Sequence, residues 1–161
     1  MEQVYDVCHN IAKIEDHVVD GKTTSLCVHR KGATRAFPPG HPGIPAAYKE
    51  IGQPVLIPGD MGRYSFLAVA GPNAMELSFG STCHGAGRAL SRNKAKKLLK
   101  GRDIKQELAD QGILAIGHNW ASLAEEAPIA YKDVADVIRV AEGAGLCRPV
   151  VKLRPLGVIK G

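Results

Sequence analysis

The residues best suited to covalent chemistry in this sequence surround His84, which is followed by Gly85, Ala86 and Gly87. Glycines just before a helix let backbone N–H groups approach an anion, and the helix N-terminus adds partial positive charge. A neutral imidazole among those donors can attack phosphorus and form a phosphoramidate, whose P–N bond is reactive enough to pass the group on. The segment therefore predicts phosphate binding with covalent transfer. The alternative is a Gly-rich turn around a hydrogen-bonded structural histidine.

Basic residues follow this segment. Arg88 and Arg92 are four residues apart, so on one helix they would project from one face as a phosphate clamp. The run to Lys105 holds eight cations against the single acid Asp103: Arg88, Arg92, Lys94, Lys96, Lys97, Lys100, Arg102 and Lys105. Such a face could track an RNA backbone, although a solvated helix is the commoner explanation of a charge run.

Two shorter motifs carry weaker signals. Cys8, His9 and Asn10 are adjacent, and neighbours on a strand point to opposite faces, so Cys8 and His9 would not share a metal ion. His9 alone could supply one metal ligand, and a buried structural histidine is the alternative. The basic segment 29–35 could line a phosphate-binding groove or form a solvated loop. Cys83 beside His84 does not indicate a thiol protease, because the fold normally brings catalytic Cys and His together from separate segments.

Composition favours a single folded unit with an anionic partner. The 161 residues are 45% hydrophobic and 23% charged, which suits one buried core, and 18 Gly with 10 Pro predict many ordered loops. The net charge of +5 favours a nucleotide or RNA as partner. No stretch is apolar enough to be a signal peptide or a membrane span, so we expect a cytoplasmic protein without membrane contact. The four cysteines are scattered, which indicates neither a zinc ribbon nor a disulfide framework.

The first half of the chain predicts strands separated by loops. An Asp20-Gly21 turn between residues 17–19 and 23–29 is a strong hairpin signal. Frequent Pro and Gly from residue 30 to 62 leave room only for a short helix near 46–51 and a strand at 55–57. The apolar run 64–70 predicts a buried strand.

The second half alternates short helices and strands. A helix directly after the glycines and ending at Gly101 is followed by one at 103–111 and a strand at 113–116. Ser122 opens a capping-box pattern, and residues 134–143 form an amphipathic helix. The tail 150–159 is extended, limited by its prolines to edge pairing. We therefore predict an α+β, loop-rich single domain with short strands and helices.

Several long sequence words, in the same order, resemble the RtcB family of RNA-splicing ligases, and the match runs from Tyr5 to Gly161. They are Cys8-His9-Asn10, residues 29–38, residues 52–59, His84-Gly85-Ala86-Gly87-Arg88, Glu125-Glu126-Ala127-Pro128 with Ala130-Tyr131-Lys132, residues 154–158 and Lys160-Gly161. The resemblance implies an RtcB-like fold for residues 1–161, as the C-terminal part of the family's catalytic domain.

The activity that the resemblance implies is RNA joining with GTP and manganese. RNA ends that carry a 2′,3′-cyclic phosphate or 3′-phosphate are joined to 5′-hydroxyl ends, as in tRNA splicing and RNA repair. His84 matches the guanylylated histidine, which passes GMP to the RNA 3′-phosphate before the 5′-hydroxyl attacks. The implied partners are tRNA halves or broken RNA ends, with archease as a candidate activating protein.

The resemblance also assigns site residues. His9 matches a manganese ligand and Asn10 a nucleotide contact beside it. The other implied nucleotide contacts are Pro58, Gly59, Asp60, Met61, Ser65, His84, Gly85, Ala86, Gly87, Tyr131, which would stack on the base, and Lys160, which would read guanine. Asp60 departs from the family's pattern, where we expect Ser. A carboxylate near phosphates needs a ribose hydroxyl, a metal or an arginine such as Arg63 to offset repulsion.

The family's N-terminal part, which supplies an Asp, a Cys, two further His metal ligands and an Asn-His-Phe segment, has no counterpart in these residues. The resemblance therefore leaves a second interpretation open. In it the chain is a noncatalytic nucleotide- or RNA-binding module that needs its N-terminal part for activity.

Overall fold

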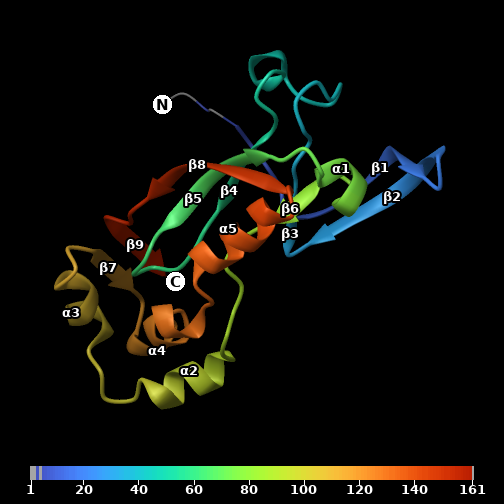
Figure 1. Ribbon diagram of the computed structural model, residues 1–161. Helices are drawn as coiled ribbons and strands as arrows, with labels where there is room; N and C mark the ends of the chain where they lie inside the picture. The colour runs from blue at the N-terminus through green and yellow to red at the C-terminus, as the bar shows by residue number, and fades with distance from the viewer. Residues whose placement is uncertain (1–2, 4, 161) are drawn as a thin grey trace.

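The longest strands of the chain are the two arms of a hairpin that projects from the rest of the molecule (Figure 1). β1 (Asn10–Val19) and β2 (Lys22–Lys31) pair antiparallel along their full length. Asp20 and Gly21 form the turn, both with positive φ (50° and 75°), as a two-residue type I′ turn requires. The predicted hairpin is confirmed, with both strands longer than expected.

The computed structural model describes Gln3 and residues 5–160, and Gly161 of the closing motif, like Met1, lies outside that range. Within it, β3 (Ala33–Arg35) pairs with β6 (Ser81–Cys83), and β4 (Pro54–Ile57), β5 (Ser65–Ala70) and β8 (Cys147–Leu153) form an antiparallel sheet in the order β4-β5-β8. β7 (Leu114–Gly117) and β9 (Gly157–Lys160) form a parallel pair. Small sheets and short elements confirm the α+β prediction.

The helices are short. They are α1 (Ala74–Ser78), α2 (Arg92–Leu98), α3 (Ile104–Ala109), α4 (Trp120–Glu125) and α5 (Val134–Gly143), with 3₁₀ turns η1 (Ala46–Tyr48) and η2 (Pro128–Ala130). The helix expected at 46–51 is thus only a 3₁₀ turn. No described helix is long and apolar enough to cross a membrane.

Two helix starts differ from the prediction. α2 begins at Arg92 and not directly after the glycines, because the Ser91 side chain accepts from the backbone N–H of Lys94 and caps the helix there. The capping box of α4 opens at Asn119, whose side chain accepts from Ser122 N, so Ser122 is its third residue and not its cap.

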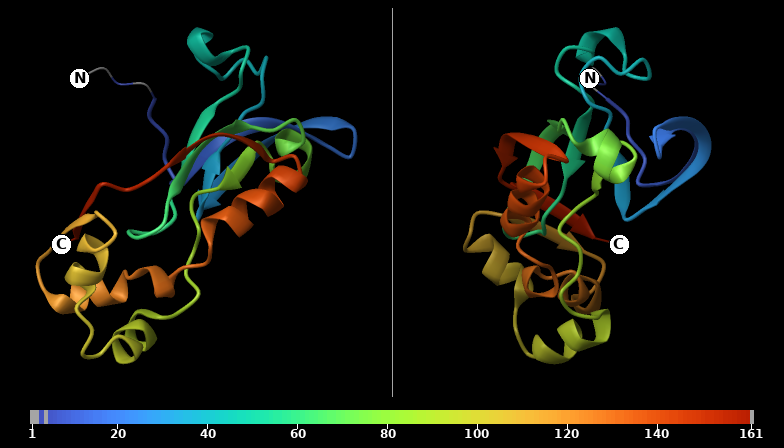
Figure 2. Two further views of the ribbon diagram at one scale, coloured as in Figure 1. Left: turned by 60° about the vertical axis from the view of Figure 1, so that its left-hand side comes forward. Right: turned by 45° about the vertical axis from the view of Figure 1, so that its right-hand side comes forward.

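Two groups of buried side chains support the fold. The sheet core lies between the β4-β5-β8 sheet and α5 and includes Val55, Ile57, Ala68 and Ile138. The helical core joins α2, α3, α4 and β7 and comprises Met61, Leu99, Ile104, Leu108, Ile113, Leu123, Ala124 and Ala127. Figures 1 and 2 show α2, α3 and α4 together at the end of the molecule away from the hairpin. The sheet core and the helical core are separate apolar clusters, each covered by amphipathic helices, so the boundary between them crosses the molecule.

A buried ionic network fixes the hairpin to β6. The fully buried Arg30 guanidinium donates to both carboxylate oxygens of Glu15, to Ser81 Oγ and to the carbonyl oxygen of Phe79. His17, also buried, contacts the same Glu15 carboxylate. Arg30 therefore neither lines a phosphate groove nor lies in a solvated loop, and both expectations for this residue are wrong.

Candidate functional site

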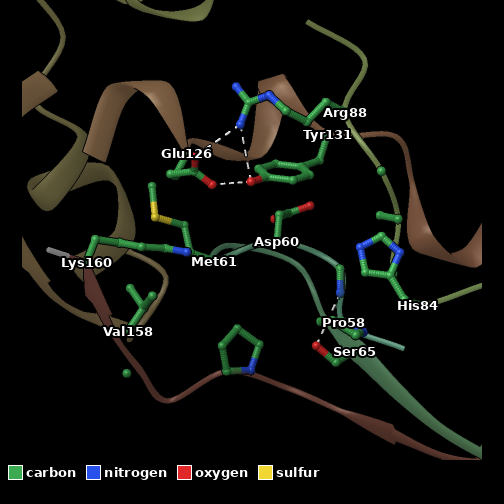
Figure 3. Close-up of a pocket in the computed structure, with 16 residues that line it drawn as sticks. Pro58, Asp60, Met61, Ser65, His84, Arg88, Glu126, Tyr131, Val158 and Lys160 are labelled. Atoms are coloured by element: carbon green, nitrogen blue, oxygen red, sulfur yellow. Dashed lines mark hydrogen bonds and ion pairs between the residues drawn. The ribbon is translucent and has the colours of Figure 1, made fainter. Parts of the chain in front are cut away.

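A cavity of about 560 Å³ lies where the sheet core and the helical core meet (Figure 3). Its walls come from the β4–β5 loop, the segment after β6, the end of α4, Tyr131 and β9. The lining residues are Pro58, Gly59, Asp60, Met61, Ser65, His84, Gly85, Ala86, Gly87, Arg88, Glu126, Tyr131, Pro155, Gly157, Val158 and Lys160. The fold thus brings together residues from sequence positions a hundred apart.

His84 follows β6 directly and is half-buried in the cavity wall. Its ring stacks on that of His9, with centroids 5.1 Å apart and an interplanar angle of 17°. The contact arises because Thr34 pairs with Thr82 on β6 and donates its hydroxyl to the Cys8 carbonyl oxygen at 3.0 Å. Among the described residues no group hydrogen-bonds to the His84 imidazole, so its ring nitrogens are available to a ligand. This differs from the alternative of a hydrogen-bonded structural histidine.

The loop Pro58–Gly59 lies against the glycines that follow His84. The Pro58 carbonyl accepts from Ala86 N at 2.9 Å, and Gly59 N donates to Ser65 Oγ at 3.3 Å. A Cβ on residue 59 would lie 2.0 Å from the Tyr64 carbonyl oxygen, so only glycine fits. The close approach of the two loops forms one end of the cavity from backbone atoms.

Arg88 and Arg92 do not share a helix face. Arg88 precedes α2 and forms an isolated bridge with Tyr131, whereas Arg92 is the first residue of α2. The Arg88 guanidinium donates to Glu126, to the Tyr131 hydroxyl and to two backbone carbonyls. Arg92 lies outside the cavity lining and pairs with Glu125 and Glu126 at 3.9 and 3.5 Å. The predicted clamp on one helix face is therefore wrong, because Arg88 lies before α2, and both cations pair with carboxylates.

Tyr131 presents its ring to the cavity. The Arg88 guanidinium carbon lies 5.0 Å from the ring centroid, and the phenol donates a short hydrogen bond to Glu126. Burial, together with the Glu126 carboxylate that accepts this hydrogen bond, raises the pKa of the Tyr131 phenol. The ring is thus locked in orientation, which is the condition for stacking on a planar ligand.

The negative charge of Asp60 is offset by contacts within its own loop. Its carboxylate accepts from the backbone N–H groups of Gly62 and Arg63 at 3.0 Å and forms an ion pair with the Arg63 side chain. Arg63 also donates to the Tyr131 carbonyl oxygen at 3.0 Å. The arginine expected to offset Asp60 is present, and the pair ties the β4–β5 loop to Tyr131.

Lys160 reaches the cavity from β9. This strand is held in place by its parallel pairing with β7, and His118 N donates to the Lys160 carbonyl oxygen at 3.1 Å. In Figure 3 the Lys160 side chain extends beside Met61 toward the wall that carries Glu126. Its ammonium therefore lies across the cavity from His84 (Figure 3).

The residues present do not complete a manganese site. Among the residues that the structure describes, no three of His, Cys, Asp and Glu come together as potential ligands. His9 is exposed beside His84, while Asn10 begins β1 and lies outside the cavity lining. A single imidazole binds Mn²⁺ weakly, because this ion is lowest in the divalent affinity order.

Four lining residues were not predicted as site residues: Glu126, Pro155, Gly157 and Val158. All four belong to segments that carry the resemblance, which was the available signal. Glu126 matters most, since its carboxylate holds both Arg88 and the Tyr131 hydroxyl. Its place depends on where α4 ends relative to Tyr131, which only the tertiary structure shows.

Comparison with known proteins agrees with this placement of the motifs. The family model described as tRNA-splicing ligase RtcB matches residues 1–161, the whole chain. The chain belongs to the RtcB family. Relatives named tRNA-splicing ligase RtcB include proteins from Archaeoglobus fulgidus (57% identical), Methanocaldococcus jannaschii (56%) and Pyrococcus horikoshii (53%), each over all 161 residues.

The chain spans only part of these RtcB relatives. It covers 33% of the Archaeoglobus protein, 17% of the Methanocaldococcus protein and 18% of the Pyrococcus protein.

Proposed function

We propose that this chain carries the nucleotide pocket and the nucleophilic histidine of a GTP- and manganese-dependent RNA ligase. The ligase would join RNA 2′,3′-cyclic phosphate or 3′-phosphate ends to 5′-hydroxyl ends. The observation that carries the proposal is the His84 imidazole, free of hydrogen bonds from the described residues, at the wall of a cavity that also contains Tyr131 and Lys160. Membership of the RtcB family supports it.

In the first step His84 acts as the nucleophile. A ring nitrogen attacks the α-phosphorus of GTP, the P–N bond forms, and the bond to the bridging oxygen breaks with release of pyrophosphate. The backbone N–H groups of Gly85 and Gly87 lie next to this imidazole and would donate to the phosphate oxygens, whereas that of Ala86 is bonded to the Pro58 carbonyl oxygen. Arg88 would act indirectly, by holding Glu126 and Tyr131.

In the later steps His84 is the leaving group. A cyclic phosphate is first opened by water to the 3′-phosphate, whose oxygen attacks the phosphorus of the histidine adduct. The P–N bond breaks, His84 is regenerated, and RNA-(3′)pp(5′)G forms. The 5′-hydroxyl then attacks the RNA 3′-phosphorus, which makes the phosphodiester and releases GMP. A nitrogen nucleophile suits this relay because its bond to phosphorus is reactive.

Recognition of the base would depend on Tyr131 and Lys160. The locked Tyr131 ring offers one face for stacking on the purine. The Lys160 ammonium is a donor, and guanine O6 accepts from it, whereas adenine carries a donor amine at that position. The pair therefore favours GTP over ATP.

Manganese would need ligands from elsewhere in the ligase. When bound, it neutralises triphosphate charge. His9 would contribute one ligand, with the others supplied by the part of the family's chain beyond these residues. Archease remains a candidate activating partner, and RNA the substrate. The cytoplasm is the proposed setting, a reducing compartment that suits the free thiols of Cys8, Cys27, Cys83 and Cys147.

Mass spectrometry tests the proposal directly. The chain is incubated with GTP and manganese, with and without the remaining part of an RtcB relative supplied in trans. A mass increase of one GMP on the His84 peptide is the expected result with the remaining part present. The rival function, a noncatalytic nucleotide- or RNA-binding module, predicts bound but uncoupled nucleotide and no adduct under either condition.

A further inference from the structure

A second groove lies outside the nucleotide pocket, between the α2–α3 loop and the start of α4. Its volume is about 730 Å³, and it is lined by Lys100, Gly101, Arg102, Asp103, Ile104, Lys105, Trp120 and Leu123. Ile104 and Leu123 belong to the helical core and form an apolar floor. Two lysines and a tryptophan form the sides. We call this the Trp120 groove.

Trp120 is unusual in being fixed and exposed at once. Its side chain is large and apolar, yet the residue is 41% exposed. The indole Nε1–H donates to the Arg102 carbonyl oxygen at 3.0 Å, which anchors one edge of the ring to the α2–α3 loop. An exposed aromatic ring with a fixed orientation loses little conformational entropy when a planar group stacks on it.

The groove carries net positive charge, since Lys100, Arg102 and Lys105 line it against the single acid Asp103, which caps α3. Lys100 and Lys105 are exposed and form no ion pair among the described residues, and the same holds for Lys94 and Lys97 on the adjacent α2. Arg102 is different, because Glu107 binds its guanidinium through two hydrogen bonds of 2.7 Å. The lysines therefore attract an anionic ligand electrostatically, whereas the Arg102 guanidinium is held by Glu107 and has a structural role.

The groove and the nucleotide pocket lie at opposite ends of α4. Trp120 is the first residue of α4, and Glu126, which lines the pocket, caps its other end. Six residues of helix correspond to roughly 9 Å along the axis. A flexible chain with one phosphate per unit could contact both sites.

We propose that the Trp120 groove binds single-stranded RNA next to the end being joined, with a base stacked on Trp120 and phosphates beside Lys100 and Lys105. The inference rests on the proposed function, because it takes RNA as the substrate. An aromatic ring flanked by lysines is the pattern by which proteins hold single strands without reading sequence. An acidic protein would match the charge but would leave the exposed ring without a stacking partner.

Trp120 supplies its own readout, since it is the single tryptophan of the chain. A short uridine oligomer is titrated into the 161-residue protein while tryptophan fluorescence is recorded, and fluorescence anisotropy of a labelled oligomer gives the affinity. We expect quenching on binding. Trp120→Ala should weaken binding about tenfold or more, whereas Trp120→Phe, which keeps an aromatic face, should retain most of the affinity.

The lysines are tested by salt dependence. The double variant Lys100→Ala with Lys105→Ala should lower the magnitude of the slope of log affinity against log salt by about 1.4, the value for two phosphate contacts on a single strand. The matched control is Lys22→Ala with Lys49→Ala, which removes two exposed lysines at the hairpin turn and beside η1 and should leave the slope unchanged. Circular dichroism verifies that each variant is folded.

Several outcomes would contradict RNA binding in the Trp120 groove. They are RNA binding without quenching, equal quenching by duplex RNA or poly-glutamate, an equal salt effect in the control, and no RNA binding at all. The His84 adduct is measured separately. Absence of the adduct with the remaining part of the ligase present, while quenching is intact, would reject the proposed ligase function and leave RNA binding in the groove. The reverse result would reject the groove alone.

Discussion

The reactivity proposed for His84 depends on an imidazole that makes no hydrogen bond to the described residues. The side chain is placed by its position after β6 and by the ring of His9, and no described group hydrogen-bonds to its nitrogens. A lone pair that is not engaged in the protein is available for attack on phosphorus. Stacking on His9 and the backbone after β6 therefore position His84, and its ring nitrogens can contact a ligand.

His84→Ala should abolish the GMP adduct and RNA joining together when the remaining part of the ligase is present, since the neighbouring imidazole, that of His9, lies outside the cavity lining. The adduct is followed by mass spectrometry and joining by gel electrophoresis of labelled RNA. His118→Ala, at an exposed histidine, is the control and should behave as the unsubstituted protein. An adduct that survives the His84 substitution would rule out this nucleophile.

Lys160→Ala should weaken GTP binding and narrow the preference for GTP over ATP. The expected loss is about 1.5–3 kcal/mol, as for a hydrogen bond to a charged group. Competition titration of the two nucleotides measures it, with Lys22→Ala as a control at a distant exposed lysine. Unchanged selectivity would show that the ammonium does not read the base.

The hairpin is joined to the strand that carries His84 by the Glu15–Arg30 network. Burial tends to raise the pKa of the Glu15 carboxyl, but hydrogen bonds and charge from Arg30 and His17 outweigh it and hold this pKa below its ordinary value of 4.5. A carboxylate with a lowered folded-state pKa stabilises the fold above the unfolded-state value. This stabilisation is lost as pH falls through the folded-state pKa.

The free energy of unfolding should therefore decrease as pH falls below about 4.5, with Glu15 as one cause. Urea unfolding at a series of pH values, followed by circular dichroism, gives the profile. Glu15→Gln should lower stability at neutral pH and flatten the acidic part of the curve. The same acid slope in the variant would assign the effect to other carboxylates.

Local signals predicted several elements well and two helix starts badly. Asp20-Gly21 specifies its own turn because few residue pairs tolerate positive φ at both positions. Arg88 and Arg92 have helical spacing, but Ser91 caps the helix between them, and spacing alone does not show where a helix begins. At α4, Ser122 and Asn119 both have side chains that can cap, and the choice depends on packing of the whole helix.

The candidate site was predictable in part. Resemblance assigned the loop at Pro58–Ser65, the glycines, Tyr131 and Lys160, which all line one cavity. It could not assign Glu126, or the neutralisation of Arg88 by that residue, because both depend on contacts between α4 and residues after it. Arg30 shows the same limit. It belongs to a basic segment that was predicted to be a groove or a loop, but in the fold it is buried and paired with Glu15.

On the scale of the whole molecule, the described residues form a pocket but do not gather a metal site. His9 is the sole residue matched to a manganese ligand, and the described residues gather no group of three ligands. Large apolar side chains are also exposed on several elements, including Ile14, Val140, Leu156 and Ile159. Exposed apolar surface favours association with another surface.

The chain alone should bind GTP poorly and should not join RNA, because the divalent ion that would neutralise the triphosphate has too few ligands. Supplying the remaining part of an RtcB relative in trans should restore manganese binding and guanylylation. Isothermal titration with manganese and GTP, and a ligation assay, measure both. Multiple-turnover ligation by the purified chain with only manganese and GTP would contradict this expectation.

The position of the pocket between two cores has a consequence for how its sequence can vary. Ala124 is fully buried in the helical core and lines neither the cavity nor the Trp120 groove, yet it belongs to α4, whose end carries Glu126. Val134 has the same relation to Gly59, whose wall it supports from the sheet core. The shape of the pocket thus depends on buried residues that do not contact the ligand. A sequence change that shifts one core must be compensated by a change in the other core for the two walls to keep facing each other.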